Sequence, residues 1–348
     1  MATKQRPVAQ FCCGDYGGDP PRNRRSRARA ANHNRKTNLK DIFDILGEWK
    51  NRREEQFALA TLVRAEGSSY RRPGARMLIS ENGETVGSLS AGCLEEEIAL
   101  QARDVLRTGQ PVLMSFDTRK RFGCAGKIDI FIECATENFF SGIAKSLDAR
   151  RSCCAITRVS GDETGSRIVE GDYEHPPSRS NGATSEPELI QKIRPPIRLM
   201  LFGGGPDSAP LYSLADSLGW QTVTVEIATA NELLSVSDEW TAAIVKSHSY
   251  GQDFAALQKL LPLELRYVGL IGPRRRRNQL LSDLLDLGVT INAGFFAPAG
   301  LDLGAETPEE IALAIVSEIQ RVFAGASGES LRERKVSIHR PIKGALLA

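Results

Sequence analysis

Residues 201–210 read LFGGGPDSAP, and they decide the fold of the second half of the chain. The stretch follows an apolar run, residues 197–202, and leads into a helical pattern, which is the context of a dinucleotide-binding turn. Gly203 and Gly205 supply the tight turn and the close backbone approach that a pyrophosphate needs. The loop therefore indicates a Rossmann-like domain.

Three residues of the same loop depart from the dinucleotide-binding pattern. Pro206 removes an amide donor, Ser208 stands where the pattern has its third glycine, and Asp207 brings negative charge. At about 6 Å from a phosphate, an inward carboxylate would cost on the order of 2 to 3 kcal/mol at an effective dielectric of about 20. Whether the domain binds a nucleotide-type cofactor is therefore open at this point.

Strands and helices alternate downstream of this loop. Four apolar segments of strand length follow one another, at residues 197–202, 221–226, 242–247 and 267–271, with helical patterns after the first, third and fourth. Such alternation predicts a doubly wound parallel sheet, which we place over residues 197–325. A last helix begins with Thr307 as cap, Pro308 in the first turn and Glu310 in position for a capping box.

The carboxyl ends of parallel strands meet at one edge of a sheet, where ligands bind. We expect Gly203, Gly204, Gly205, Ser208, Glu226, Arg274 and Arg275 to bind a cofactor there, with the glycines and arginines on phosphate. His248 is a candidate acid–base catalyst at the same edge. The structural alternatives are a solvated helix face for the arginines and a polar lining role for His248.

The upstream half has a different pattern. A helix with apolar positions from Leu39 to Trp49, a second helix and several alternating strands predict an α+β domain over residues 38–170 with a mixed or antiparallel sheet. Residues 1–37 form a basic leader that we expect to be disordered, because it lacks apolar periodicity. Residues 171–196, rich in Pro, Ser and Asn, are interpreted as a linker, and residues 326–348 as a tail.

Net charge is close to zero, at +2. This balance argues against nucleic acid or membrane as the main partner, and the chain has neither an apolar run long enough to span a membrane nor a secretion signal. We therefore expect a cytoplasmic protein. Its seven cysteines show no zinc-ribbon spacing, which favours free thiols.

Two cysteines lie in loops of small residues. Cys93 begins a helix, where free amides favour a thiolate, and Cys124 has glycine neighbours and a basic approach. Each is equally well explained as a small residue in a tight turn. Cys153 and Cys154 lie in an apolar strand and are interpreted as packing residues. Arg71, Arg72 and Arg76 surround Pro73-Gly74, which suggests either an anion-binding turn or an exposed hairpin.

Several segments together resemble the XdhC/CoxI family, the xanthine dehydrogenase accessory factors. The first domain resembles it in residues 60–80, in GSLSAGCLEEE (87–97) and in FGCAGKIDIFIE (122–133), and the second in residues 201–220, 267–281 and 300–319. The chain departs from the family pattern at Ala91 and Ala125, where glycines are usual, and at Ser208. The resemblance implies an XdhC/CoxI-type domain followed by a Rossmann-like domain.

The resemblance also implies a function. The resemblance implies a maturation factor that binds molybdenum cofactor, as molybdopterin or its nucleotide form. Such a factor delivers the cofactor, in sulfurated form, to an apo molybdenum hydroxylase of the xanthine dehydrogenase type. On this basis Cys93 and Cys124 are the candidate catalytic and metal-binding thiols, since thiolates suit a soft metal or a sulfur in transit. We also expect a homo-oligomer and consider a cysteine desulfurase as a second partner.

Two other functions fit parts of the sequence. An NAD(P)-dependent oxidoreductase would use the second domain, with His248 as the only proton donor that the pattern offers. A protein adaptor with a relic Rossmann pocket would leave the cysteine loops without a role. An accessory factor is therefore the favoured interpretation over an enzyme.

Overall fold

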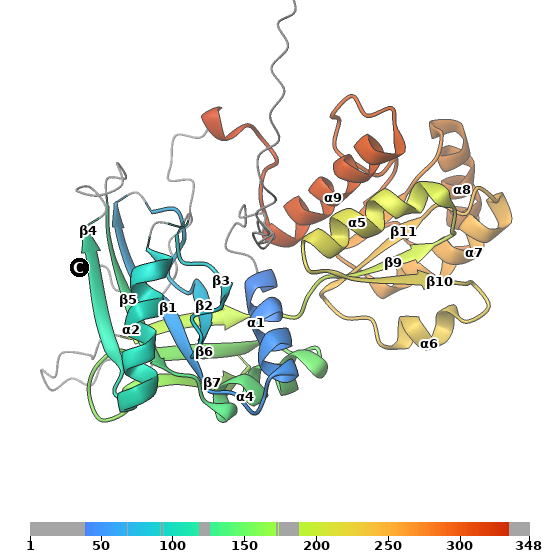
Figure 1. The fold of residues 1–348 in the computed structure, drawn as a ribbon. Coiled ribbons are helices and arrows are strands. Elements are labelled where there is room, and N and C mark those ends of the chain that lie inside the picture. The colour runs from blue at the N-terminus through green and yellow to red at the C-terminus, as the bar shows by residue number, and fades with distance from the viewer. Residues whose placement is uncertain are drawn as a thin grey trace, which may run out of the picture. The chain divides into compact units, whose positions relative to one another are not determined.

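The computed structural model describes residues 39–67, 69–90, 92, 94–117, 126–171, 173 and 188–333 (Figure 1). The expected leader over residues 1–37 lies outside this part of the chain, as do Cys93 and Cys124. Two antiparallel sheets form the first half and one parallel sheet forms the second half. No helix of the described residues is long and apolar enough to cross a membrane.

The larger antiparallel sheet has the order β3-β2-β1-β5-β4. Its strands are β1 (Phe57–Gly67), β2 (Arg76–Ser80), β3 (Thr85–Gly87), β4 (Val112–Asp117) and β5 (Gly126–Cys134). Helix α2 (Glu95–Thr108) packs Ile98, Ala102 and Val105 on one face. Helices α1 (Leu39–Asn51) and α4 (Glu137–Asp148) contribute to the core on the other face. The predicted α+β pattern is confirmed, with antiparallel pairing throughout this sheet.

The smaller sheet has the order β7-β6-β8. Strand β6 (Cys153–Arg158) lies between β7 (Gly165–Glu170) and β8 (Glu188–Ile193) and pairs antiparallel with both. Strand β8 differs from the expectation of a linker over residues 171–196. Its polar sequence, ELIQKI, gave little signal, because only Leu189 and Ile193 are hydrophobic residues buried in the core. Pairing with the apolar strand β6 places it in the sheet.

The arginines of the Pro-Gly turn point inward. Arg71 is buried and forms an ion pair with the buried Asp41 of α1, and Arg76 is buried and donates a hydrogen bond to Gln191 of β8. Burial lowers the pKa of Arg76 to about 10. Arg71 and Arg76 therefore connect elements of the first domain, and their burial fits neither an anion-binding turn nor an exposed hairpin.

The parallel sheet has the order β10-β9-β11-β12-β13. Its strands are β9 (Arg198–Phe202), β10 (Gln221–Val225), β11 (Thr241–Val245), β12 (Tyr267–Leu270) and β13 (Phe295–Phe296). In sequence order this arrangement is 2-1-3-4-5, the flavodoxin-like form of the doubly wound sheet. The prediction of a Rossmann-like parallel sheet is confirmed, and the short α6 and β13 are additions to the predicted elements.

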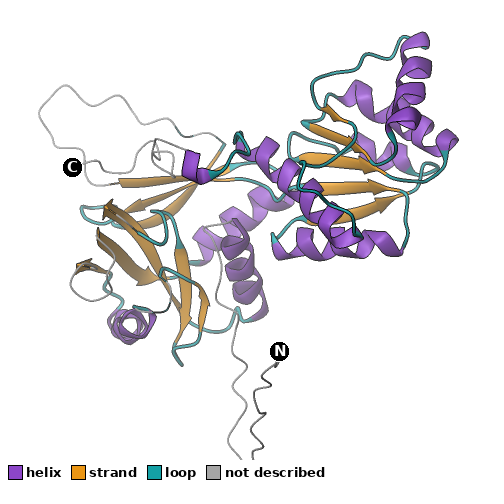
Figure 2. Ribbon diagram, turned by 90° about the horizontal axis from the view of Figure 1, so that it is seen from above, coloured by secondary structure: helices purple, strands orange, loops and turns teal. Residues whose placement is uncertain are grey.

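Helices cover both faces of this sheet (Figure 2). Helices α5 (Ala209–Ser217) and α9 (Pro308–Ala324) pack on one face, whereas α6 (Ala230–Ser235), α7 (Tyr250–Leu260) and α8 (Arg274–Asp286) pack on the other. The predicted capping box is present at α9: the Thr307 hydroxyl accepts from the amide of Glu310, whose carboxylate accepts from the amide of Thr307. Each face therefore has its own apolar core.

Candidate functional site

The strand order places a topological switch point between β9 and β11. The chain leaves β9 toward β10 on one side of the sheet and leaves β11 toward β12 on the other side. In open sheets of this kind, the crevice outside the carboxyl ends of such strands is the usual ligand-binding position. The loops after β9 and β11 therefore form the expected ligand-binding position of this sheet (Figure 1).

The glycine loop, residues 203–205, forms a close backbone turn after β9. Gly203 has a φ of 100°, and a Cβ placed on it would lie 2.5 Å from the Cα of Ser247 in the loop after β11. Gly204 and Gly205 are exposed, and their amides donate to no acceptor within the described residues. Two free amides in such a turn can hold phosphate oxygens.

A buried lysine lies beneath this loop. Lys246, directly after β11, is 1% exposed, and its Nζ lies 2.6 Å from Oδ1 of Asp207 and 2.8 Å from Oγ of Ser208. The hydrogen bond from Lys246 holds the pKa of the Asp207 carboxyl below its usual value. Lys246 is not among the predicted site residues, although a lysine at the end of the apolar strand AAIVK is a visible signal.

His248 lies beside the same carboxylate. Its Nε2 is 3.7 Å from Oδ2 of Asp207, and its side chain is largely exposed. Its φ of 58° is a left-handed value that non-glycine residues seldom adopt. The structure thus places His248 beside the glycine loop through Asp207, and its role as an acid–base catalyst remains a prediction.

Asp253 connects the loop after β11 to the arginine run. This buried carboxylate on α7 accepts hydrogen bonds from the amide and hydroxyl of Ser247 and forms an ion pair with Arg276 of α8. Arg277 donates to the carbonyl of Ala297 at 2.9 Å. Two of the four consecutive arginines therefore have structural partners.

The remaining predicted ligands are exposed. Arg274 and Arg275 begin α8 with side chains in solvent, and Glu226 follows the end of β10. Within the described part of the chain, no hydrogen bond or ion pair joins these three side chains to the glycine loop. Arg274 and Arg275 are thus the cations of the run that remain available to a ligand, and their predicted role remains a prediction.

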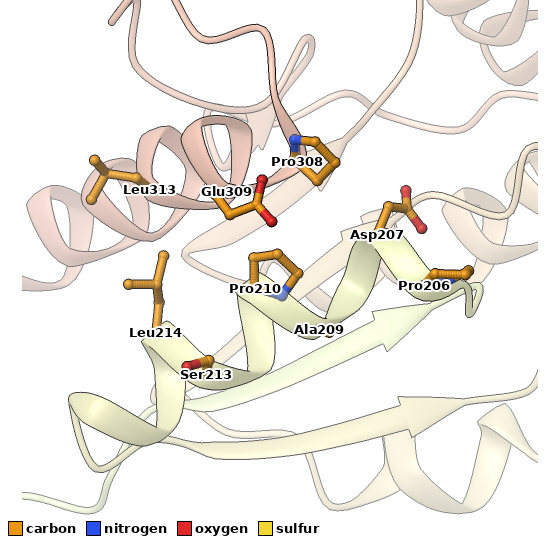
Figure 3. A pocket seen from close by; sticks show the side chains of 9 residues that line it. All are labelled: Pro206, Asp207, Ala209, Pro210, Ser213, Leu214, Pro308, Glu309 and Leu313. Carbon is orange, nitrogen blue, oxygen red and sulfur yellow. The ribbon is translucent and has the colours of Figure 1, made fainter.

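An apolar groove continues from the glycine loop. It has a volume of about 790 Å³ and lies between the first turns of α5 and α9, lined mainly by proline and leucine side chains (Figure 3). Asp207 and Glu309 are its acidic residues, and Pro206 and Asp207 belong to the short helix that follows the glycines. The groove is within the size range of small-molecule sites, and its lining begins at Pro206, directly after the glycines.

The four cysteines considered in the sequence fall into two groups. Cys93 and Cys124, the candidate catalytic and metal-binding thiols, lie outside the described residues, so their predicted roles remain untested. Cys153 and Cys154 are buried in β6, as the packing interpretation predicts, and burial raises the pKa of the Cys153 thiol. In the regions that the structure covers, no group of three or more His, Cys, Asp or Glu side chains could hold a metal ion.

Comparison with known proteins places this architecture in a family. Residues 51–117 match the XdhC and CoxI family, and residues 199–319 match the XdhC Rossmann domain. The chain is also 30% identical to a probable xanthine dehydrogenase subunit of Bacillus subtilis (strain 168), over 76% of this chain and 93% of that protein. The chain belongs to the XdhC and CoxI family.

Two further relatives extend this comparison. The molybdenum cofactor insertion chaperone PaoD of Escherichia coli (strain K12) is 24% identical over 76% of this chain and 82% of its own length. A crystal structure from Bacillus halodurans, described as a xanthine dehydrogenase, superposes with a TM-score of 0.68 over 82% of this chain and 96% of that chain, at 24% identity. The second comparison shows that the fold is shared.

Proposed function

We propose that this member of the XdhC and CoxI family is an accessory factor that binds molybdenum cofactor and delivers it, in sulfurated form, to an apo molybdenum hydroxylase of the xanthine dehydrogenase type. The relatives named for xanthine dehydrogenase and for cofactor insertion support this proposal. The proposal places the protein in the cytoplasm, as a homo-oligomer, with a cysteine desulfurase as a second partner.

The observation that carries the proposal is the pair of free amides at the switch point. Gly204 and Gly205 present donors in an exposed turn, and the cofactor is a pterin that carries a phosphate or a nucleotide diphosphate. The phosphate would accept from these amides and from Arg274 and Arg275, with the pterin rings along the neighbouring apolar groove. The glycine loop and the arginines therefore suit the phosphate of the cofactor, and the apolar groove suits its rings.

Sulfur chemistry is assigned to the thiols. A thiolate is a soft ligand and a nucleophile, so Cys93 and Cys124 are proposed to contact the molybdenum or the sulfur in transit. Replacing Cys93 with serine should leave the fold intact and abolish activation of the client hydroxylase. Full activation by Cys93→Ser would argue against a thiol mechanism.

The proposal is tested on protein co-expressed with a host that makes molybdopterin. Pterin fluorescence of the purified protein, after oxidation, reports bound cofactor. Because a charge-assisted contact contributes roughly 1.5 to 3 kcal/mol, Arg274→Ala or Arg275→Ala should reduce retention tenfold or more. Arg107→Ala, an exposed arginine on α2, is the matched control and should leave retention unchanged.

The same preparation tests the alternatives. Turnover of NADH or NADPH without bound pterin would support an NAD(P)-dependent oxidoreductase, for which His248 is the available proton donor. Absence of both pterin and turnover would support a protein adaptor. Either result would contradict cofactor delivery.

A further inference from the structure

Lys246 is buried under the glycine loop, and its two side-chain partners belong to one turn. The ammonium contacts Oδ1 of Asp207 and Oγ of Ser208, and both residues closely follow the free amides of Gly204 and Gly205. A buried charge is tolerated only when it is paired and hydrogen-bonded. The three side chains therefore form one unit, here called the lysine anchor: Asp207, Ser208 and Lys246.

Asp207 would otherwise oppose an anion. Its carboxylate lies beside Gly205, with Oδ1 2.7 Å from a Cβ placed on that glycine. At about 6 Å, an unpaired negative charge would weaken phosphate binding by roughly 30-fold to 150-fold. Of the cations that the structure describes, only Lys246 is within hydrogen-bonding distance of this carboxylate. The His248 imidazole is 3.7 Å away and largely exposed, and Arg276 is paired with Asp253.

We propose that Lys246 is a positioning residue that prepares the glycine loop for a phosphate. It offsets the charge of Asp207 and holds Ser208 in place directly after the exposed glycines, at the position where the dinucleotide-binding pattern has its third glycine. The inference rests on the proposed function, because it concerns the phosphate of the same cargo. It also explains why serine replaces glycine at position 208: a glycine could not accept the hydrogen bond from the ammonium.

Four variants test the lysine anchor by pterin retention. Lys246→Met leaves Asp207 uncompensated and should reduce retention at least tenfold. Asp207→Asn removes the negative charge and should raise retention. The double variant Lys246→Met, Asp207→Asn carries neither charge and should recover retention to within about threefold of the wild type. Lys259→Met is the control, because this lysine donates instead to Asn231 and to the carbonyl of Ile227.

If Lys246 had a purely structural role, Asp207→Asn would not rescue the loss of pterin retention. If Lys246 only supported the fold, the double variant would retain no more pterin than Lys246→Met, and this result would overturn the inference. Thermal melting checks that Lys246→Met is folded. If it is not folded, Asp207→Asn is the deciding variant, and lower pterin retention than in the wild type would refute the proposed role of Lys246.

Inorganic pyrophosphate separates this inference from the proposed function. Its binding to each variant is measured by calorimetry in the absence of pterin. If the wild type retains no pterin but binds pyrophosphate, and the variants bind it in the expected order, cofactor delivery fails and the lysine anchor stands. If pterin is retained and neither probe follows that order, the lysine anchor fails and cofactor delivery stands.

Discussion

At the scale of single residues, the glycines of the loop have different roles: one supports the fold, and another is free to contact a ligand. Gly203 lies against the backbone of Ser247, whereas a Cβ on Gly204 would meet no heavy atom within 4 Å. The first glycine is therefore needed by the protein itself. The second is free to approach a ligand closely.

These two glycines give contrasting predictions for substitution by alanine. Gly203→Ala should lower the melting temperature strongly, because its Cβ would lie within 3 Å of the Ser247 and Lys246 backbone at a positive φ. Gly204→Ala should leave the melting temperature within a few degrees and weaken pterin retention. Thermal denaturation and pterin fluorescence measure the two effects, and equal stability losses would contradict the assignment.

Asp207 gives a prediction about pH. Because its pKa is lowered by Lys246, the carboxylate contributes stability that is present above the unfolded value of about 3.8 and lost as pH falls through the folded value. Wild type should thus exceed Asp207→Asn in free energy of unfolding near neutral pH, and the difference should shrink in acid. Urea titrations at several pH values check this, and a difference that grows in acid would contradict it.

At the scale of elements, helix ends and helix pairs carry local interactions that sequence alone shows only in part. The capping box of α9 is visible in the sequence because its residues are close together in the chain. The contact between α7 and α8, in which Tyr250 donates to Asp283, is not visible, because it joins residues on two helices. Removing the cap should change the free energy of unfolding, and removing the contact between the helices should change the pKa of Tyr250.

The cap of α9 is tested by Thr307→Ala. Loss of the hydrogen bond from the amide of Glu310 to the hydroxyl should cost about 1 kcal/mol of unfolding free energy. Thr229, the cap of α6, makes no side-chain capping bond, so Thr229→Ala is the matched control and should cost less. Chemical denaturation measures both, and equal costs would show that the capping hydrogen bond is unimportant.

The helix pair is tested by the ionisation of Tyr250. Its hydrogen bond to Asp283 raises the pKa of Tyr250 to about 12, so Asp283→Asn should return that pKa toward the usual value of about 10. Ultraviolet difference titration, with Tyr250→Phe to identify the signal, follows the phenol. A tyrosine that already titrates near 10 in the wild type would contradict the contact.

At the scale of the whole molecule, sequence predicted most elements and the parallel sheet. It did so because apolar periodicity and turn residues are local signals. It failed at β8, whose place in the sheet depends on pairing with β6, and at Lys246, whose partners lie on another loop. The proximity of Gly203, Ser208 and His248 was predictable, because the carboxyl ends of parallel strands lie at one edge of a sheet. The buried ion pairs were not, since a charged residue gives no pattern that shows its partner.

The apolar cores predict that the second domain folds alone. The hydrophobic clusters on both faces of the parallel sheet contain only residues from Ile197 onward, and those of the first half contain none of these. A fragment of residues 196–325 should therefore unfold cooperatively. Circular dichroism during heating checks this, and a gradual loss of signal without a transition would show that the domain depends on the rest of the chain.

The proposed binding site needs both β9 and β11, which pair at the centre of the sheet, so it can form only after both strands have been synthesised. These strands are separated in sequence by β10 and two helices, yet the glycine loop follows one strand and Lys246 follows the other. A nascent chain that has not yet released β11 from the ribosome holds the glycines without the ammonium that offsets Asp207. If the loop binds the cofactor as proposed, incomplete chains bind it more weakly than the finished protein, and full affinity requires the centre of the sheet.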